Sequence, residues 1–187
     1  MGSDRAGQIC QADTLHGPLR SAWETTICLG TRRFLLRPMQ PGDVALYPAY
    51  LAGVTAEDMR LRFLSPTRTI PPDLLLRLTH LDHHRDVAFI ALDDQSGELA
   101  GIVRYGSDAG HKAAEFAELV RSDLQGLGLG IALMRLLIDY ARVDRLGRLD
   151  GLILRENQRM QAVCRELGFI VQPVHDDLTL VRASLIL

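Results

Sequence analysis

The chain has 187 residues, 47% of them hydrophobic and 24% charged, which is the composition of one ordinary globular domain with a single core. Its formal net charge of -2, with no block of about five basic residues, argues against nucleic acid as the principal partner. Charged residues interrupt every apolar run well before about 18 residues, so we expect no membrane insertion.

The cysteines and the N-terminal residues indicate the compartment and the domain limits. Cys10, Cys28 and Cys164 are odd in number and lack metal-ligand spacing, which favours a reducing cytoplasm over a disulfide scaffold. The polar start has no apolar segment typical of an export signal. Residues 1–21 mix Gly, Pro, Ser, Asp and Gln without period, so we expect a flexible leader followed by one domain over 22–187.

The first half of the chain predicts a strand pair followed by helices. In chain order these are strands at 23–29 and 33–37 joined at Gly30-Thr31, a helix capped by Asp43 to about 53, a helix capped by Thr55 to 63, and a helix opened by Pro71 to 78. Ser65-Pro66 ends the second of these helices.

The second half alternates strands with two longer helices. In chain order these are strands at 87–92, 99–105 and 114–120, a glycine loop, a helix to about 146, a strand at 149–154, a helix at 157–167 with Gly168 at its end, and strands at 169–171 and 178–184. This order predicts an α/β (α+β) fold with a mixed, mainly antiparallel sheet, flanking helices and one crossover.

Three glycines at alternate positions join the strand at 114–120 to the following helix. Gly126, Gly128 and Gly130 lack a Cβ where the backbone would approach a ligand, and a helix start with free amides binds anions. No Lys-Ser/Thr follows, so this is not a Walker loop, and the spacing is not the G-x-G-x-x-G of a dinucleotide site. A turn that merely lets strand and helix pack closely remains the alternative.

The loop and the last helix together match a known pattern. The segment Gln125–Gly130 fits a Q/R-x-x-G-x-G/A loop, and Asn157, Met160, Gly168 and Phe169 fit an N-x-x-[AM]…G-F helix and strand. In these motifs the chain resembles the GNAT acyl-CoA N-acyltransferases. This resemblance implies the GNAT fold.

A narrower likeness connects the chain to one group within that family. It rests on Arg62–Pro66, on Leu78–Asp82, and on Glu115–Ala117 ahead of Val120–Asp123. These segments resemble the GNAT domain of bacterial Pat-type protein lysine acetyltransferases.

The resemblance implies acetyl-CoA as co-substrate. Its pyrophosphate would lie on the amides of the glycine loop and helix start, and its pantetheine would meet backbone groups at the end of the preceding strand. The cofactor-binding residues predicted in this way are Leu119, Val120, Arg121, Gln125, Gly126, Leu127, Gly128, Leu129, Gly130, Ile131 and Asn157.

Transfer to an amine needs a base, because a lysine ammonium with pKa near about 10.4 is not a nucleophile. By resemblance Glu115 matches the position of the base, and Phe116, Ala117 and Leu119 would provide an apolar setting that raises its pKa. Glu118 is the rival carboxylate, at a position where the group usually has an apolar residue. Strand alternation puts the two carboxylates on opposite faces unless a bulge intervenes, so we expect one to act and favour Glu115.

A general acid and a metal are less evident. Cys164 stands where many members of the family carry Tyr, and we interpret it as a buried structural cysteine; a weak thiol donor or no side-chain acid remain open. His80, His83 and His84 lie near Asp82, but their spacing is not that of a zinc site. We therefore expect no metal.

The leading hypothesis is a cytoplasmic, acetyl-CoA-dependent protein Nε-lysine acetyltransferase that works by direct attack, with Glu115 as base. By resemblance, acyl-CoA synthetases would be the protein substrates. Two alternatives stay open: a small amine or amino acid as acceptor, and a catalytically silent acyl-CoA-binding sensor. Neither nucleic acid nor membrane is an expected partner, and a homodimer is left open.

Overall fold

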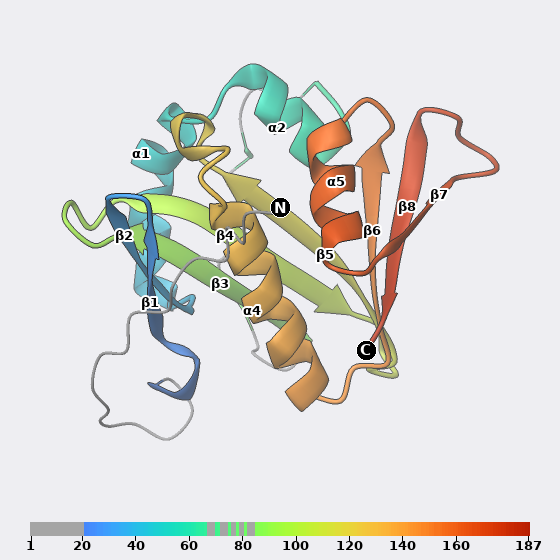
Figure 1. Cartoon of the computed structure of the whole chain (residues 1–187), viewed down its shortest axis with the longest axis horizontal. Helices are drawn as coiled ribbons and strands as arrows, with labels where there is room; N and C mark the ends of the chain where they lie inside the picture. The colour runs from blue at the N-terminus through green and yellow to red at the C-terminus, as the bar shows by residue number, and fades with distance from the viewer. Residues whose placement is uncertain (1–20, 67–69, 72–74, 76–77, 79–80, 82–84) are drawn as a thin grey trace, which may run out of the picture.

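The computed structural model describes residues 21–66, 70–71, 75, 78, 81 and 85–187. Its centre is an eight-stranded sheet in the order β1-β2-β3-β4-β5-β6-β8-β7 (Figure 1). The strands are β1 (Thr25–Leu29), β2 (Arg32–Pro38), β3 (Asp86–Asp93), β4 (Leu99–Ser107), β5 (Ala113–Val120), β6 (Arg148–Leu154), β7 (Ile170–Pro173) and β8 (Leu180–Ile186). Within the sheet β5 and β6 pair in parallel and the other neighbours pair antiparallel, which confirms the predicted mixed, mainly antiparallel sheet.

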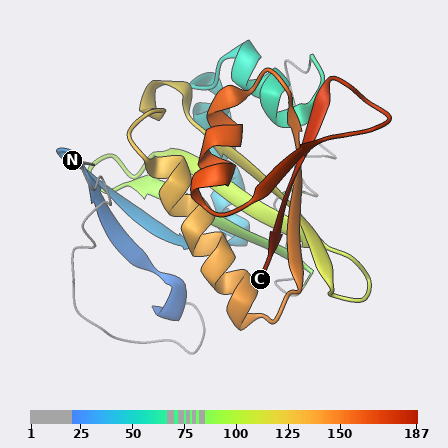
Figure 2. The same cartoon turned by 45° about the vertical axis from the view of Figure 1, so that its right-hand side comes forward.

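Helices cover both faces of the sheet. In the described residues they are the 3-10 turns η1 (Ser21–Trp23), η2 (Pro41–Leu46) and η3 (Ser122–Leu124), and the helices α1 (Tyr47–Ala52), α2 (Ala56–Phe63), α4 (Leu129–Val143) and α5 (Gln158–Glu166). Figures 1 and 2 show α4 and α5 on one face and α1 on the other. Each face has its own cluster of buried apolar side chains, the larger one beneath α4 and α5.

Most predicted elements are confirmed, and the helix predicted at 43–53 is the main correction. Pro41 starts the segment earlier, as the 3-10 turn η2, and α1 follows directly. Asp43 does not begin a helix: its buried carboxylate accepts the Gln40 amide at 2.7 Å and pairs with Arg37 at 2.7 Å. This ion pair joins the end of β2 to η2.

The other helices predicted from the sequence agree with the structure to different degrees. The helix expected to reach residue 146 ends at Val143, because Arg145 adopts a left-handed φ of 60° and Leu146 donates back to the Ala141 carbonyl at 2.9 Å. Thr55 caps α2 as predicted, accepting the Asp58 amide at 3.1 Å. Of the helix predicted at 71–78, most residues lie outside the described ones, as do residues 1–20.

The strands β5 and β6 pair along only part of their length and then separate. Their parallel pairing covers Ala113–Glu115 and Arg148–Asp150, and beyond it the strands diverge toward the end of the sheet where α2 lies (Figure 1). The Phe116 ring occupies the start of the gap: a Cβ on Gly151 would stand 2.4 Å from it. The divergence opens a cleft between β5, α4 and α5.

Candidate active site

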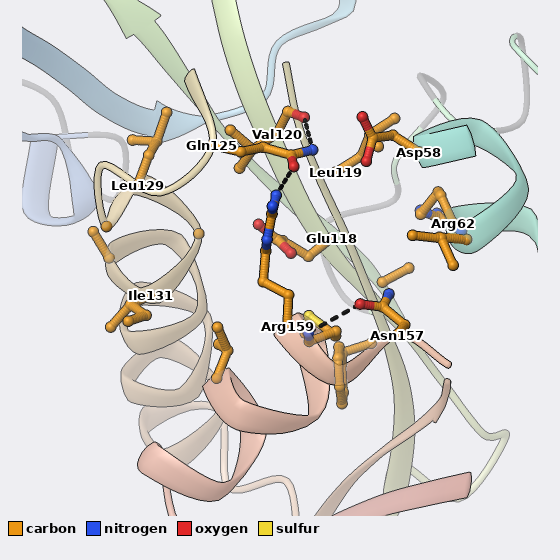
Figure 3. A pocket seen from close by; sticks show the side chains of 18 of the residues that line it. Asp58, Arg62, Glu118, Leu119, Val120, Gln125, Leu129, Ile131, Asn157 and Arg159 are labelled. Carbon is orange, nitrogen blue, oxygen red and sulfur yellow. Dashed lines mark hydrogen bonds between the residues drawn. The ribbon is translucent and has the colours of Figure 1, made fainter. Parts of the chain in front are cut away.

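A cleft of about 1480 Å³ occupies the space between the diverging strands. Its walls are β5, the glycine loop, the first turns of α4 and α5, and α2 (Figure 3). Pockets for drug-sized ligands usually measure about 300–1,000 Å³. The cleft is therefore large enough for a long, extended ligand.

The glycine loop forms an anion site at one end of the cleft. Gly126 and Gly128 have φ values of 79° and 95°, which L-residues rarely adopt. Within the described part of the chain, the amides of Gly126, Leu127 and Gly128 donate to no acceptor. The first turn of α4 has no acidic residue and no side-chain cap, so these amides and the helix dipole favour an anion there.

The third glycine makes room for a carboxylate of the protein itself. A Cβ on Gly130 would lie 2.5 Å from Oε1 of Glu118, which reaches across from β5. The absence of a Cβ at this position was predicted to admit a ligand. In the structure it admits the Glu118 side chain.

Gln125 and Arg159 connect the two walls at the mouth of the cleft. The Gln125 side-chain amide donates to the Val120 carbonyl at 3.3 Å, and Arg159 donates to the Gln125 side-chain oxygen (Figure 3). Arg159, at the start of α5, was missed by sequence reasoning because it stands 34 residues from its partner. It adds a positive charge near the anion site.

Asn157 lies in the cleft wall as predicted, but much of its side chain is already engaged. Its Oδ1 accepts the Met160 amide at 3.0 Å and so caps α5. Its NH2 group is left for a ligand.

Leu119, Val120 and Arg121 were predicted to bind the ligand through their backbone, but part of that backbone is already hydrogen-bonded within the protein. The Arg121 amide donates to the Ala100 carbonyl at 2.9 Å, and the Leu119 carbonyl accepts the Tyr50 hydroxyl at 2.7 Å. Since backbone groups alternate sides along an antiparallel strand, the Val120 amide points toward the gap with β6. Val120 is thus the best placed of the three for a ligand in the cleft.

The two candidate carboxylates on β5 lie on opposite faces of the sheet. The pairing of β5 with β4 runs without a bulge through Glu115 and Glu118, as strand alternation predicted. Glu115 is an exposed residue that lines the cleft. Glu118 is half-buried inside the cleft (Figure 3). Burial raises the pKa of Glu118 to about 7, against the opposing effect of Arg62. The apolar setting expected for Glu115 is therefore found at Glu118.

Arg62 faces Glu118 from α2 (Figure 3). Its guanidinium lies over the Phe63 ring, 4.8 Å from the ring centre, and burial lowers its pKa. Among the described residues it has no ion-pair partner. The cleft therefore holds a cation that can receive a ligand's negative charge.

A second connection joins α2 to the segment before the glycine loop. Asp58 accepts hydrogen bonds from the Ser122 hydroxyl and, at 2.6 Å, from the Thr55 hydroxyl. Ser122 in turn accepts the Thr55 amide at 2.8 Å. Sequence reasoning missed this group, whose members come together through the fold.

Cys164 is buried beneath α5, with an exposed fraction of 0%. Burial raises the pKa of its thiol to about 12, so the thiolate needed for nucleophilic attack is disfavoured. This agrees with its interpretation as a structural cysteine.

The part of the chain that the structure describes has neither a metal-ligating cluster nor a membrane-spanning helix. In the described part of the chain no three His, Cys, Asp or Glu side chains gather in a way that could hold a metal. The candidate cluster of His80, Asp82, His83 and His84 lies outside the described residues. No described helix combines the length and apolar character required to cross a membrane.

Comparisons with known proteins agree with this geometry. A family model described as "Acetyltransferase (GNAT) family" matches residues 55–169. Acetyltransferase PA5475 of Pseudomonas aeruginosa is 34% identical over 152 residues, covering 80% of this chain and 82% of that protein. Acetyltransferase Pat of Mycolicibacterium smegmatis is 31% identical over 156 residues, covering 81% of this chain and 45% of that protein, so the chain spans less than half of that relative.

A comparison with solved structures agrees with the family match. The crystal structure of the GNAT domain of S. lividans PAT superposes with a TM-score of 0.83 at 25% identity, covering 92% of this chain and 100% of that one. The resemblance drawn from the sequence motifs is thus confirmed.

Proposed function

We propose, on the premise that this chain belongs to the GNAT family of acetyltransferases, that it moves an acetyl group from acetyl-CoA to the ε-amine of a protein lysine. The family uses acetyl-CoA, and one observation supports its binding here above others. The same cleft is lined by the unpaired backbone amides of the glycine loop and, on β5, by the carboxylate of Glu115. A cleft of about 1480 Å³ has room for an extended anionic thioester that reaches both.

In this proposal the glycine loop receives the pyrophosphate. The amides of Gly126, Leu127 and Gly128 donate to its oxygens, and the positive end of the α4 dipole adds to the attraction. The pantetheine arm then follows β5, where the Val120 amide is free to bond it. Arg159 lies close enough to the loop to balance phosphate charge.

Glu115 is the proposed base. A lysine approaching the exposed edge of the cleft meets this carboxylate before the thioester, and transfer of an ammonium proton to Glu115 frees the lone pair for attack. The nitrogen then bonds the acetyl carbon directly, without an acyl-enzyme. The inert Cys164 thiol supports a direct route. Glu118 is the alternative base.

The lysine acceptor rests on the likeness to Pat-type protein lysine acetyltransferases. A second acceptor class is favoured by one specific observation, the half-buried Arg62 without an ion-pair partner among the described residues. Its guanidinium would bind the carboxylate of an amino acid and so favour a small acceptor.

The acceptor class can be tested by incubating the protein with acetyl-CoA and either acyl-CoA synthetases or a panel of small amines and amino acids. We expect mass spectrometry to find acetyl-lysine on the proteins. Acetylation confined to small amines would contradict the lysine proposal. Binding of acetyl-CoA without transfer to any acceptor would instead indicate a sensor.

A further inference from the structure

Glu118 is a carboxylate without a partner inside the cleft. It leaves β5 on the face covered by α4, and its Oε1 lies against the backbone of Gly130. No hydrogen bond or ion pair reaches it from any residue that the structure describes. A desolvated carboxylate that accepts no hydrogen bond favours its neutral, protonated form. In that form Glu118 is a proton donor that points into the cleft.

Several elements around the cleft contribute titratable or charged groups. They are Glu115 on β5, Tyr50 on α1, Asp58 and Arg62 on α2, Arg135 and Asp139 on α4, Glu156 after β6, and Arg159, Cys164 and Glu166 on α5. Arg62 lowers the pKa of Glu118, but burial outweighs it and leaves the value at about 7. The charges around Glu118 therefore do not force it to ionise below neutral pH.

Glu115 and Glu118 sit in contrasting environments on one strand. They are three residues apart, about 10 Å along an extended strand, and face opposite sides of it. One carboxylate is exposed to water and the other is enclosed. Where two carboxyl groups at one site differ in this way, the exposed one stays ionised and serves as base, and the enclosed one holds a proton and serves as acid.

We propose that Glu118 is the general acid that protonates the departing CoA thiolate. The inference rests on the proposed acetyl transfer and adds a residue to it. Glu115 passes the ammonium proton on to water. The neutral amine nitrogen then bonds the acetyl carbon and loses a second proton to Glu115, the carbon–sulfur bond breaks, and its electron pair stays on sulfur. The sulfur takes the Glu118 proton, which leaves CoA as a free thiol. Proton exchange with water then restores both carboxyl groups.

The test is the dependence of kcat on pH between about 5.5 and 9, at saturating acetyl-CoA and lysine peptide, for the wild type and Glu118→Gln. Wild-type kcat should fall above pH 7 as Glu118 loses its proton. Glu118→Gln should have a kcat at least about tenfold lower and lack that fall. Glu24→Gln, which changes an exposed carboxylate outside the cleft, is the matched control and should keep the wild-type profile.

Two further measurements separate an acid from a structural residue. CoA binding and circular dichroism should be unchanged in Glu118→Gln, and Glu115→Gln should be slower but keep the fall above pH 7. The inference is overturned if Glu118→Gln retains the fall, or if wild-type kcat instead rises through pH 7 and Glu118→Gln abolishes that rise, which would make Glu118 the base. If the wild type transferred acetyl to no amine, the proposed function would fail with it.

Discussion

Two glutamates three residues apart on one strand acquire different chemistry from their surroundings. Alternation along β5 assigned them to opposite faces from the sequence alone, and the structure bears this out. The burial of each side chain could not be predicted from strand alternation, because it depends on how α4 and α5 pack over one face of the sheet. That packing puts Glu118, and not Glu115, in the enclosed position.

Replacing Glu115 by Gln removes the proposed base while keeping the shape of the side chain. We expect kcat with a lysine peptide to fall by about 10²- to 10⁴-fold, because the amine then loses its proton without help. The dissociation constant for CoA, measured by calorimetry, should stay within about twofold. A kcat close to that of the wild type would rule out Glu115 as base.

Glu118 also links stability to pH. Its folded-state pKa of about 7 lies above its ordinary value of 4.5, so the folded state binds the proton more tightly. The resulting stabilisation is fully present below pH 4.5 and is lost as pH rises through 7, an effect of at most about 3 kcal/mol. In urea unfolding, the free energy of unfolding of Glu118→Gln should increase relative to that of the wild type between pH 5 and pH 8. An equal difference at both pH values would contradict the burial of this carboxyl group.

At the scale of elements, local patterns predicted strands and helix starts well but not all helix limits. Gly30, with φ of 62°, makes the predicted turn between β1 and β2, and Thr55 caps α2. The helix predicted at 43–53 was wrong in its first part, because the segment starts earlier, with Gln40 as the N-cap of a 3-10 turn, and Asp43 lies inside that turn, where its carboxylate accepts the Gln40 amide and pairs with Arg37. Contacts such as that between Asp58 and Ser122, 64 residues apart, leave no local signal.

Gly151 tests how β5 and β6 separate. Alanine there would place its Cβ 2.4 Å from the Phe116 ring, which is held edge-on to Phe169 with ring centres 5.2 Å apart. The ring must shift, so Gly151→Ala should lower the free energy of unfolding by about 1–3 kcal/mol. Gly42→Ala, which meets nothing within 4 Å, is the control. Equal stability of the two variants in urea would show that the ring can move freely.

At the scale of the molecule, motifs far apart in sequence line one cleft. The glycine loop, the carboxylates of β5 and the start of α5 were each recognised in the sequence, and their family was identified from them. The opening that brings them together was not predictable, because it depends on where the pairing of β5 with β6 stops. Strand periodicity shows which residues share a face but not where two strands part.

Because the cofactor binds the folded cleft, CoA should stabilise the whole domain. At about 100 times its dissociation constant a ligand adds about 2.7 kcal/mol, which raises Tm by about 5–10 °C in a domain of this size. Gly128→Ala, which strains a backbone with φ of 95° at the anion site, should lose most of that shift. A full shift in this variant would show that CoA does not depend on the glycine loop.

The most direct test of acetyl transfer is the initial rate of thiol release from acetyl-CoA with and without a lysine peptide. We expect release that depends on the peptide and matches, mole for mole, the acetyl-lysine found in it. Release at the same rate without the peptide, or none at all while acetyl-CoA binds, would contradict the proposal that this cleft carries acetyl groups to amines.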